Sequence, residues 1–244
     1  MPDGVDVRSL DEATLSRIIE TLEGYVTSQR RDRIRSVVSS RTRDVVLVIE
    51  HLRNPHNAAA VFRTAEAFGF FEVHAIPEKD QLDVSARVSS GSHKWLELHS
   101  HRSIEDAYSN LAGRGYRVLA SAIRGDAIAV SELDVTTPIA LVFGNERDGL
   151  SKVAIDTAHG RFRIPMFGFV ESFNISVAAA VTAYEVTKRR AAVGLLPSMI
   201  SRDRLALHAV YLTRSLESSR ALLGHVGLPV PILHETAIRL KEEE

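Results

Sequence analysis

The sequence predicts an α/β protein built on a parallel β-sheet, with helical segments before and after the sheet domain. Residues 45–49 form a continuous, mostly β-branched apolar run, which is typical of a strand buried on both faces. Between residues 45 and 190, segments with strand character alternate with segments of helical character, and this alternation favours a parallel sheet. The residues before and after this region have the spacing of amphipathic helices.

Residues 1–43 are expected to form a small helical extension. The run Ser9–Glu12 has the pattern of a capping box, and apolar residues follow it at helical spacing as far as Gly24. A second helix is expected over residues 31–39. Residues 29–43 hold six arginines and one aspartate. Such a patch can bind phosphate groups with an affinity that falls as salt rises, but a solvated helix face has the same composition.

The sheet domain is expected to span residues 44–191. After the first strand, strands are predicted at 72–76, 116–121, 139–143 and 161–164, and helices at 57–68, 103–112, 151–158 and 174–190. The remaining residues, 192–244, are expected to add one or two amphipathic helices over 202–223.

Composition narrows the class of protein further. The 244 residues are 45% hydrophobic and 25% charged, with a net charge of -1, which is the balance of a soluble globular protein. We find no cysteine, no signal-like N-terminus and no apolar run long enough to span a bilayer, so we expect a cytoplasmic protein without membrane contact. The ten histidines are scattered apart from His99 and His101, and we expect no metal site.

Three loops, each after a predicted strand, carry the candidate chemistry, because open α/β sheets bind ligands at the carboxyl ends of their strands. The first, residues 51–57, leads into a helix that contains Arg63. Asn57 is explained equally well as a helix cap, and Arg63 as a surface residue or an anion ligand.

The second loop, residues 143–150, places Gly144 and Gly149 around a polar turn, although it matches neither the GxxxxGK[ST] nor the GxGxxG pattern. The third, residues 164–174, is apolar but contains Ser172 and Asn174, which can bind a polar ligand edge or cap the next helix.

In this order and spacing the loops resemble the three signature motifs of SPOUT methyltransferases of the TrmH type. NPHNAAAVFRTAEAFG (54–69) resembles the first motif, FGNERDGLS (143–151) the second, and IPMFGFVESFNISVAAAV (164–181) the third. The resemblance is co-linear over residues 45–188. It implies a fold whose C-terminal part forms a deep trefoil knot, a homodimer with the active site near the subunit interface, and S-adenosylmethionine as the cofactor.

The resemblance also assigns roles residue by residue. The catalytic positions it implies are Arg63, Asn57, Glu146, Ser172 and Asn174. The cofactor-binding positions it implies are Ala120, Ser121, Gly144, Asn145, Ile164, Met166, Phe173 and Asn174. A guanidinium holds its proton tightly, so we expect Arg63 to anchor a phosphate and stabilise a developing alkoxide rather than act as a simple base.

The helical extensions and the stretch Gly91–Trp95 resemble the branch that methylates a ribose 2'-hydroxyl of tRNA, most specifically the D-loop guanosine. We therefore expect an RNA-binding surface formed by Arg30, Arg31, Arg33, Arg35, Arg63 and Lys94. The alternatives are rRNA 2'-O-methylation by the same site and a non-catalytic RNA-binding protein that kept the fold. A nucleotide-dependent oxidoreductase is disfavoured by the missing glycine fingerprint.

Overall fold

The computed structural model describes residues 4–52, 54–77, 91–123, 125–145 and 147–233. These residues divide into two compact units. One contains the described residues of 1–41 and 197–234, and the other contains those of 42–196.

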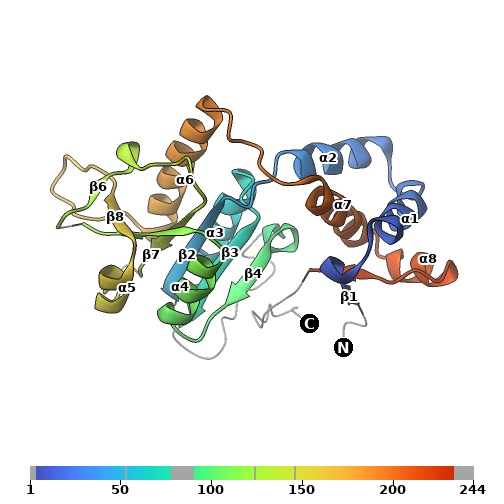
Figure 1. Ribbon diagram of the computed structural model, residues 1–244, viewed down its shortest axis with the longest axis horizontal. Helices are drawn as coiled ribbons and strands as arrows, with labels where there is room; N and C mark the ends of the chain where they lie inside the picture. Colours follow the sequence, from blue (N-terminus) through green and yellow to red (C-terminus); the bar gives the residue numbers. More distant parts are fainter. Residues whose placement is uncertain (1–3, 53, 78–90, 124, 146, 234–244) are drawn as a thin grey trace. The chain divides into compact units, whose positions relative to one another are not determined.

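The first unit brings together the two ends of the chain. Its elements are β1 (Val5–Asp6), η1 (Val7–Ser9), α1 (Glu12–Glu23), α2 (Ser28–Ser39), α7 (Ser201–Ser215), α8 (Ser219–His225) and β9 (Pro231–Ile232). Figure 1 shows the early helices beside the late ones, and β1 pairs in parallel with β9. The buried side chains of α1 repeat at helical spacing at Leu15, Ile18 and Leu22, so the predicted amphipathic pattern forms a core here.

The start of α1 differs from the prediction. Asp11 is the N-cap, and its Oδ1 accepts a hydrogen bond of 2.7 Å from the Thr14 backbone N–H. Ser9 instead ends the η1 turn, and its hydroxyl donates to the Asp6 carbonyl. Aspartate and serine are both good N-caps, so a sequence with both offers two starting points two residues apart. The helix α2 likewise begins earlier than predicted, with Thr27 as its cap.

The second unit is built on a parallel sheet. Its strands are β2 (Val45–Leu52), β3 (Glu72–Pro77), β4 (Glu97–Ser100), β5 (Arg117–Ser121), β6 (Ile128–Ala129), β7 (Ile139–Phe143) and β8 (Gly160–Arg163). Within the described residues the order is β4-β3-β2-β7-β5-β8-β6. Neighbouring strands of this sheet pair in parallel, with Ile49 of β2 opposite Phe143 of β7 and Ala120 of β5 opposite Val142. The parallel sheet is therefore confirmed, while β4 and β6 are short strands that the sequence pattern did not reveal.

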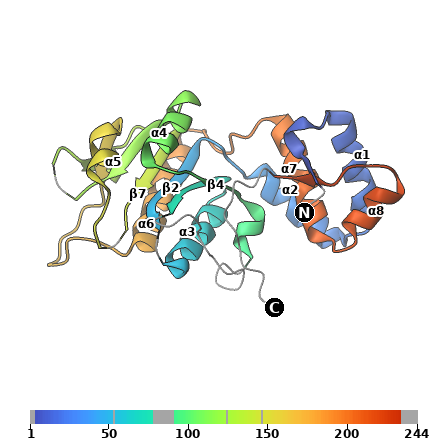
Figure 2. The same ribbon diagram turned by 90° about the horizontal axis from the view of Figure 1, so that it is seen from below.

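Helices cover both faces of this sheet. The helices α3 (Pro55–Ala67) and α6 (Ile175–Ala192) pack on one face, and α4 (Ile104–Gly113) and α5 (Lys152–Thr157) pack on the other (Figure 2). Along β2, alternate side chains enter the two cores: Val45, Leu47 and Ile49 face α3, whereas Val46 and Val48 face α4. Because both faces are buried, the strand needs no polar residue in alternation, which explains its continuous apolar run.

Short 3-10 turns complete the sheet unit, η2 (Ser92–Trp95) before β4 and η3 (Val130–Glu132) after β6. Among the helices described, none is long and apolar enough to cross a membrane.

Candidate active site

A cavity of about 960 Å³ opens at the carboxyl ends of β5, β7 and β8. Its walls come from residues 121–123, 143–145, 147–150, 162–168 and 170–173, together with Ile155 of α5 and the first turn of α6. These segments are far apart in the sequence, and they meet because parallel strands end at the same edge of the sheet. The volume lies at the upper end of the range usual for small-molecule sites.

The loop after β7 is held in a tight return by its own backbone. A Cβ on Gly144 would lie 2.1 Å from the backbone carbon of Gly149, so only glycine fits at position 144. Gly149 has a φ of 68°, in the left-handed region that favours glycine. The buried Asn145 fixes the turn between them, because its Oδ1 accepts the backbone N–H groups of Arg147 and Asp148 at 2.9 and 2.8 Å.

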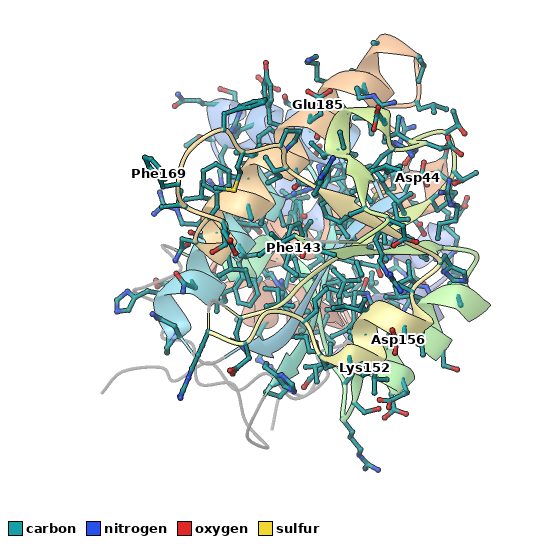
Figure 3. All side chains as sticks on the ribbon, turned by 90° about the vertical axis from the view of Figure 1, so that its left-hand side faces the viewer. Asp44, Phe143, Lys152, Asp156, Phe169 and Glu185 are labelled. Atoms are coloured by element: carbon teal, nitrogen blue, oxygen red, sulfur yellow. The ribbon has the colours of Figure 1, made fainter. Side chains whose placement is uncertain are left out.

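The segment after β8 forms an apolar wall that continues into solvent. Ile164 and Met166 are partly buried and line the cavity. Phe167 and Phe169 are fully exposed, and Figure 3 shows Phe169 projecting away from the ribbon. The segment ends at Asn174, whose Oδ1 caps α6 by accepting from the Ser176 backbone N–H at 2.9 Å. The capping role considered for Asn174 is thus confirmed.

A hydrogen bond joins the first motif to the third. The amide of Asn174 donates to Oδ1 of Asn57 at 3.3 Å. The cap of α3 is Asn54, which accepts from the His56 backbone N–H, and Pro55 begins the helix. The capping explanation of Asn57 is therefore wrong, because proline suits the first helical position and places the cap one residue before it.

Arg63 lies on α3, with an exposed side chain that has no partner among the described residues. It does not line the cavity in the described part of the chain, and neither do Asn57 and Asn174. An exposed guanidinium that is not part of the small-molecule cavity suits a large, anionic second substrate better than the cavity's own ligand.

Most of the expected cofactor positions lie on the cavity wall. Those that line it are Ser121, Gly144, Asn145, Ile164, Met166 and Phe173, joined by Ser172 from the catalytic set. Ala120 does not, because its side chain is fully buried in the core beneath α4 and α5. Glu146 lies outside the described residues. Sequence reasoning missed Arg147 and Asp148, whose exposed side chains line the cavity within the loop that the second motif marks.

The expected RNA-binding arginines of α2 have different surroundings. Arg30 donates to the Ser215 hydroxyl at 3.2 Å, and Arg35 forms an ion pair of 2.8 Å with Glu23. Arg33 is exposed and Arg31 is partly exposed. Lys94 is exposed on η2, in the other unit.

A second polar cluster lies toward the amino ends of β3 and β4, at the end of the sheet opposite the cavity. Glu72 is buried and accepts hydrogen bonds from Arg114 Nη2 at 2.9 and 2.7 Å, and it also pairs with Arg43. Burial alone raises the pKa of Glu72, but contact with His74 and the two arginine charges lower it overall. Arg43 also reaches Glu97 at 3.2 Å, so buried carboxylates and guanidinium groups balance one another.

Three histidines stack beside these charges. The rings of His74 and His99 are 4.5 Å apart, and those of His74 and His101 are 5.1 Å apart. Burial lowers the pKa of His99 to about 3 and that of His101 to about 4, and the next largest cause in both is electrostatic repulsion from His74 in its protonated form. These imidazoles are therefore neutral at neutral pH.

Ligand atoms of Glu72, His74 and His99 lie within 4.8 Å of one another, which raises the question of a metal ion. The rings of His74 and His99 are stacked with planes that differ by only 20°, so their lone pairs lie in two nearly parallel planes and are poorly placed to meet at one ion. The carboxylate is already engaged by two guanidinium groups. The geometry is that of an ion-pair network and not of a preformed metal site.

Comparison with known proteins identifies the family of this chain. Residues 44–184 match the SpoU rRNA methylase family. The chain is 40% identical over 169 residues to a tRNA (guanosine(18)-2'-O)-methyltransferase of Thermus thermophilus, covering 69% of this chain and 87% of that one.

Among solved structures, the A. aeolicus TrmH/SpoU tRNA modifying enzyme has a TM-score of 0.71 at 26% identity, covering 77% of this chain and 97% of that one. The SpoU methyltransferase AviRb from Streptomyces viridochromogenes, in complex with the cofactor AdoMet, has a TM-score of 0.57 at 25% identity, covering 66% and 64%.

The chain belongs to the SpoU methylase family, since the family match covers more than half of its length. Within that family it is similar to tRNA (guanosine(18)-2'-O)-methyltransferases. The resemblance found in the three sequence motifs is thereby confirmed.

Proposed function

We propose that this chain transfers a methyl group from S-adenosylmethionine to a ribose 2'-hydroxyl of tRNA, the D-loop guanosine in particular. It is an S-adenosylmethionine-dependent RNA 2'-O-methyltransferase. The observation that carries the proposal is the convergence of loops two and three on one cavity, with the first motif hydrogen-bonded to the third beside it.

The cavity suits a cofactor with an apolar ring and several polar edges. Gly144 and Asn145 present backbone groups, while Ile164, Met166 and Phe173 offer apolar surface. When bound, S-adenosylmethionine supplies a methyl group on an electrophilic sulfonium. The chain's contribution is to hold this group in one orientation and to exclude water from it.

Arg63 is the residue we assign to the RNA. A ribose hydroxyl is a weak nucleophile at neutral pH, so it must be placed accurately and its developing negative charge must be stabilised. The guanidinium of Arg63 is exposed and, within the described chain, unpaired, as a phosphate ligand must be before its substrate arrives. Asn57 and Asn174 orient this region through their hydrogen bond, and we assign Glu146 and Ser172 to the same catalytic set.

We further propose that the segment from β8 to α6 forms the trefoil knot of the family. A homodimer is supported by an apolar face of α6 that the described residues leave exposed. Val177, Val181 and Tyr184 repeat at helical spacing and are exposed, and Phe173 continues them toward the cavity. A second copy of this chain on that face would place both active sites near the interface.

We assign tRNA binding to the N-terminal extension, residues 1–43, together with the C-terminal extension, residues 192–244, and we assign catalysis to residues 44–191. The support is the arginine-rich α2 and its packing with α7 in one unit. The cytoplasmic location and the absence of a catalytic metal stay predictions.

A triple variant tests the RNA-binding surface. Replacing Arg31, Arg33 and Arg35 by alanine should weaken tRNA binding roughly tenfold or more and reduce the salt slope by about one for each lost phosphate contact. Binding is measured by filter retention at several salt concentrations. An unchanged affinity and slope would remove this surface from the proposal, and Arg17→Ala on α1 is the matched control.

The function itself is tested by incubating the protein with labelled S-adenosylmethionine and either tRNA or rRNA fragments, followed by mapping of the modified nucleotide. We expect label in tRNA at the ribose of the D-loop guanosine. Label in rRNA alone would favour the alternative substrate, and label on a base would contradict the 2'-O chemistry. No labelling, together with intact RNA binding, would favour the non-catalytic alternative.

A further inference from the structure

A buried carboxylate next to the cavity has no role in the mechanism above. Glu50 lies near the carboxyl end of β2, with 2% of its surface exposed. It directly follows Ile49, the residue paired with Phe143 at the end of β7. Glu50 is therefore level with Gly144, where the loop of the second motif begins.

Glu50 contacts the opposite end of that loop. Its Oε2 accepts a hydrogen bond of 2.7 Å from the backbone N–H of Ser151. Ser151 is also the N-cap of α5, because its hydroxyl accepts from the Ala154 N–H at 3.0 Å. A hydrogen bond to an ionised acceptor is about twice as strong as one between neutral groups, and burial strengthens it further.

The loop thus has an internal and an external attachment. Asn145, which belongs to the loop, fixes the turn, and Glu50 of β2 holds the end of the loop at Ser151. Glu50 also affects Tyr108, whose hydroxyl donates to the Ala154 carbonyl in α5. Burial raises the pKa of Tyr108, and the negative charge of Glu50 raises it further.

The end of β2 is itself irregular at this point. The strand register shifts between Glu50 and Leu52, and His51 has a φ of 53°, which is uncommon for a residue other than glycine. Backbone conformations of this kind persist where surrounding contacts fix them and they cluster at functional sites. The first motif begins four residues later, at Asn54, so Glu50 lies just before the first motif and is hydrogen-bonded to the last residue of the second.

We propose that Glu50 is a positioning residue for cofactor binding, which holds the described part of the loop after β7, residues 144–145 and 147–151, in its binding conformation through the Ser151 N–H. This inference rests on the proposed function, since it takes the loop's ligand to be S-adenosylmethionine. Glu50 touches no substrate and acts through the loop. Without it the loop occupies its binding conformation only part of the time, and the apparent Kd rises by the inverse of that fraction.

The test compares Glu50→Leu, which leaves no acceptor for the Ser151 N–H, with a matched control, Glu97→Leu, which alters an equally buried carboxylate at the opposite end of the sheet. Calorimetry on the full chain should show the Kd for S-adenosylmethionine rising roughly tenfold in Glu50→Leu, because a competent fraction of about one in ten has that effect. At saturating cofactor, kcat should stay within about twofold. Glu97→Leu should lower the Tm but leave the Kd unchanged.

A second variant acts on the donor. Ser151 has a φ of -60°, which proline can adopt, so Ser151→Pro removes the N–H with little change to the backbone angle. It also removes the hydroxyl that caps α5, so Ser151→Ala, which loses the hydroxyl alone, is its reference. The Kd of Ser151→Pro should exceed that of Ser151→Ala by about the factor seen in Glu50→Leu, and Glu50→Leu should add little in the Ser151→Pro background, because both remove the same bond. Hydrogen exchange should show lost protection of the Ser151 amide in Glu50→Leu.

The outcomes separate the two claims. A wild-type chain that fails to bind S-adenosylmethionine would overturn the proposed function. A wild-type chain that binds it, with an unchanged Kd in folded Glu50→Leu, would overturn the role of Glu50 alone. An equal rise in Glu97→Leu would also overturn it, because the effect would then be one of general stability.

Discussion

At the carboxyl end of the sheet, the loops after β5, β7 and β8 surround an open cavity. At the amino end of the same sheet, ionised side chains and imidazoles are packed against one another. Both ends are polar, but they differ in which groups are available. The Glu72 carboxylate is held by Arg114 and Arg43, whereas Arg63 is exposed and has no partner in the described chain.

The difference indicates how a polar cluster is to be interpreted. A strongly shifted pKa is often a sign of a functional site, and here the lowest histidine pKa values belong to the cluster far from the cavity. Those shifts come from burial next to a balanced ion-pair network. The site that binds ligands is identified by loop geometry and by groups without partners.

The largest expected effect comes from filling the space at Gly144. The substitution Gly144→Ala places a Cβ 2.1 Å from the Gly149 backbone carbon, so the loop must move. A displacement of about 1 Å in such a loop can cost roughly a hundredfold in activity, and we expect at least that loss in kcat/KM. Steady-state methylation kinetics measure it.

The control is Gly113→Ala at the end of α4, where no atom lies within 4 Å of the added Cβ. It should leave activity unchanged and stability equal or slightly higher. If Gly144→Ala kept the wild-type activity, the cavity would not be the cofactor site.

The next effect concerns the exposed face beside the cavity. The substitution Val181→Lys places a charge on the α6 face that we assign to the dimer, and it should convert dimers to monomers with a severalfold or larger loss of activity. Analytical ultracentrifugation measures the state. Val153→Lys on α5 is the control, since Val153 and Val181 are similarly exposed, at 41% and 38%. A variant Val181→Lys that sediments like the wild type would contradict the assignment.

The smallest expected effect on activity comes from the amino-end cluster, which should act on stability. His99 and His101 have pKa values near 3 and 4 in the folded chain, below the ordinary value of 6.5. Below pH 6.5 the unfolded chain therefore binds more protons, so stability falls as the pH drops from about 6.5 toward the folded-state values and the decline ends below them. Each histidine contributes at most about 1.4 kcal/mol per pH unit over that window.

Thermal unfolding between pH 7.5 and 4 checks this expectation, with His99→Gln giving a shallower decline and near wild-type activity at pH 7.5. His56→Gln is the control, because His56 is exposed on α3. A decline that is equally steep in His99→Gln would show that the acid sensitivity arises elsewhere.

Sequence patterns predicted the central sheet well because strands buried on both faces leave a continuous apolar signal, as in β2 and β7. They missed β6, whose two residues carry too little periodicity, and they placed a capping box at Ser9 where Asp11 competes successfully. The motifs located the cavity loops because glycine and asparagine are needed there by backbone geometry, as at Gly144 and Asn145.

Other features depended on tertiary contacts that no local pattern encodes. In the sequence, Glu50 is a single polar residue at the end of a strand, and its hydrogen bond to Ser151 joins positions 101 residues apart. The cluster of Glu72, His74 and His99 likewise arises from strand register, which sets residues of β3 beside those of β4. The pair His99 and His101 was visible in the sequence, but the charges that fix their state were not.

The central claim is that methyl transfer occurs at the carboxyl end of the sheet with Arg63 acting on the RNA. The most direct measurement is single-turnover methylation of tRNA by Arg63→Ala, beside the calorimetric Kd for S-adenosylmethionine. We predict a rate at least roughly a hundredfold lower, with a Kd within about twofold of the wild type, because Arg63 does not line the cavity. An Arg63→Ala protein that methylates tRNA at the wild-type rate would contradict the account.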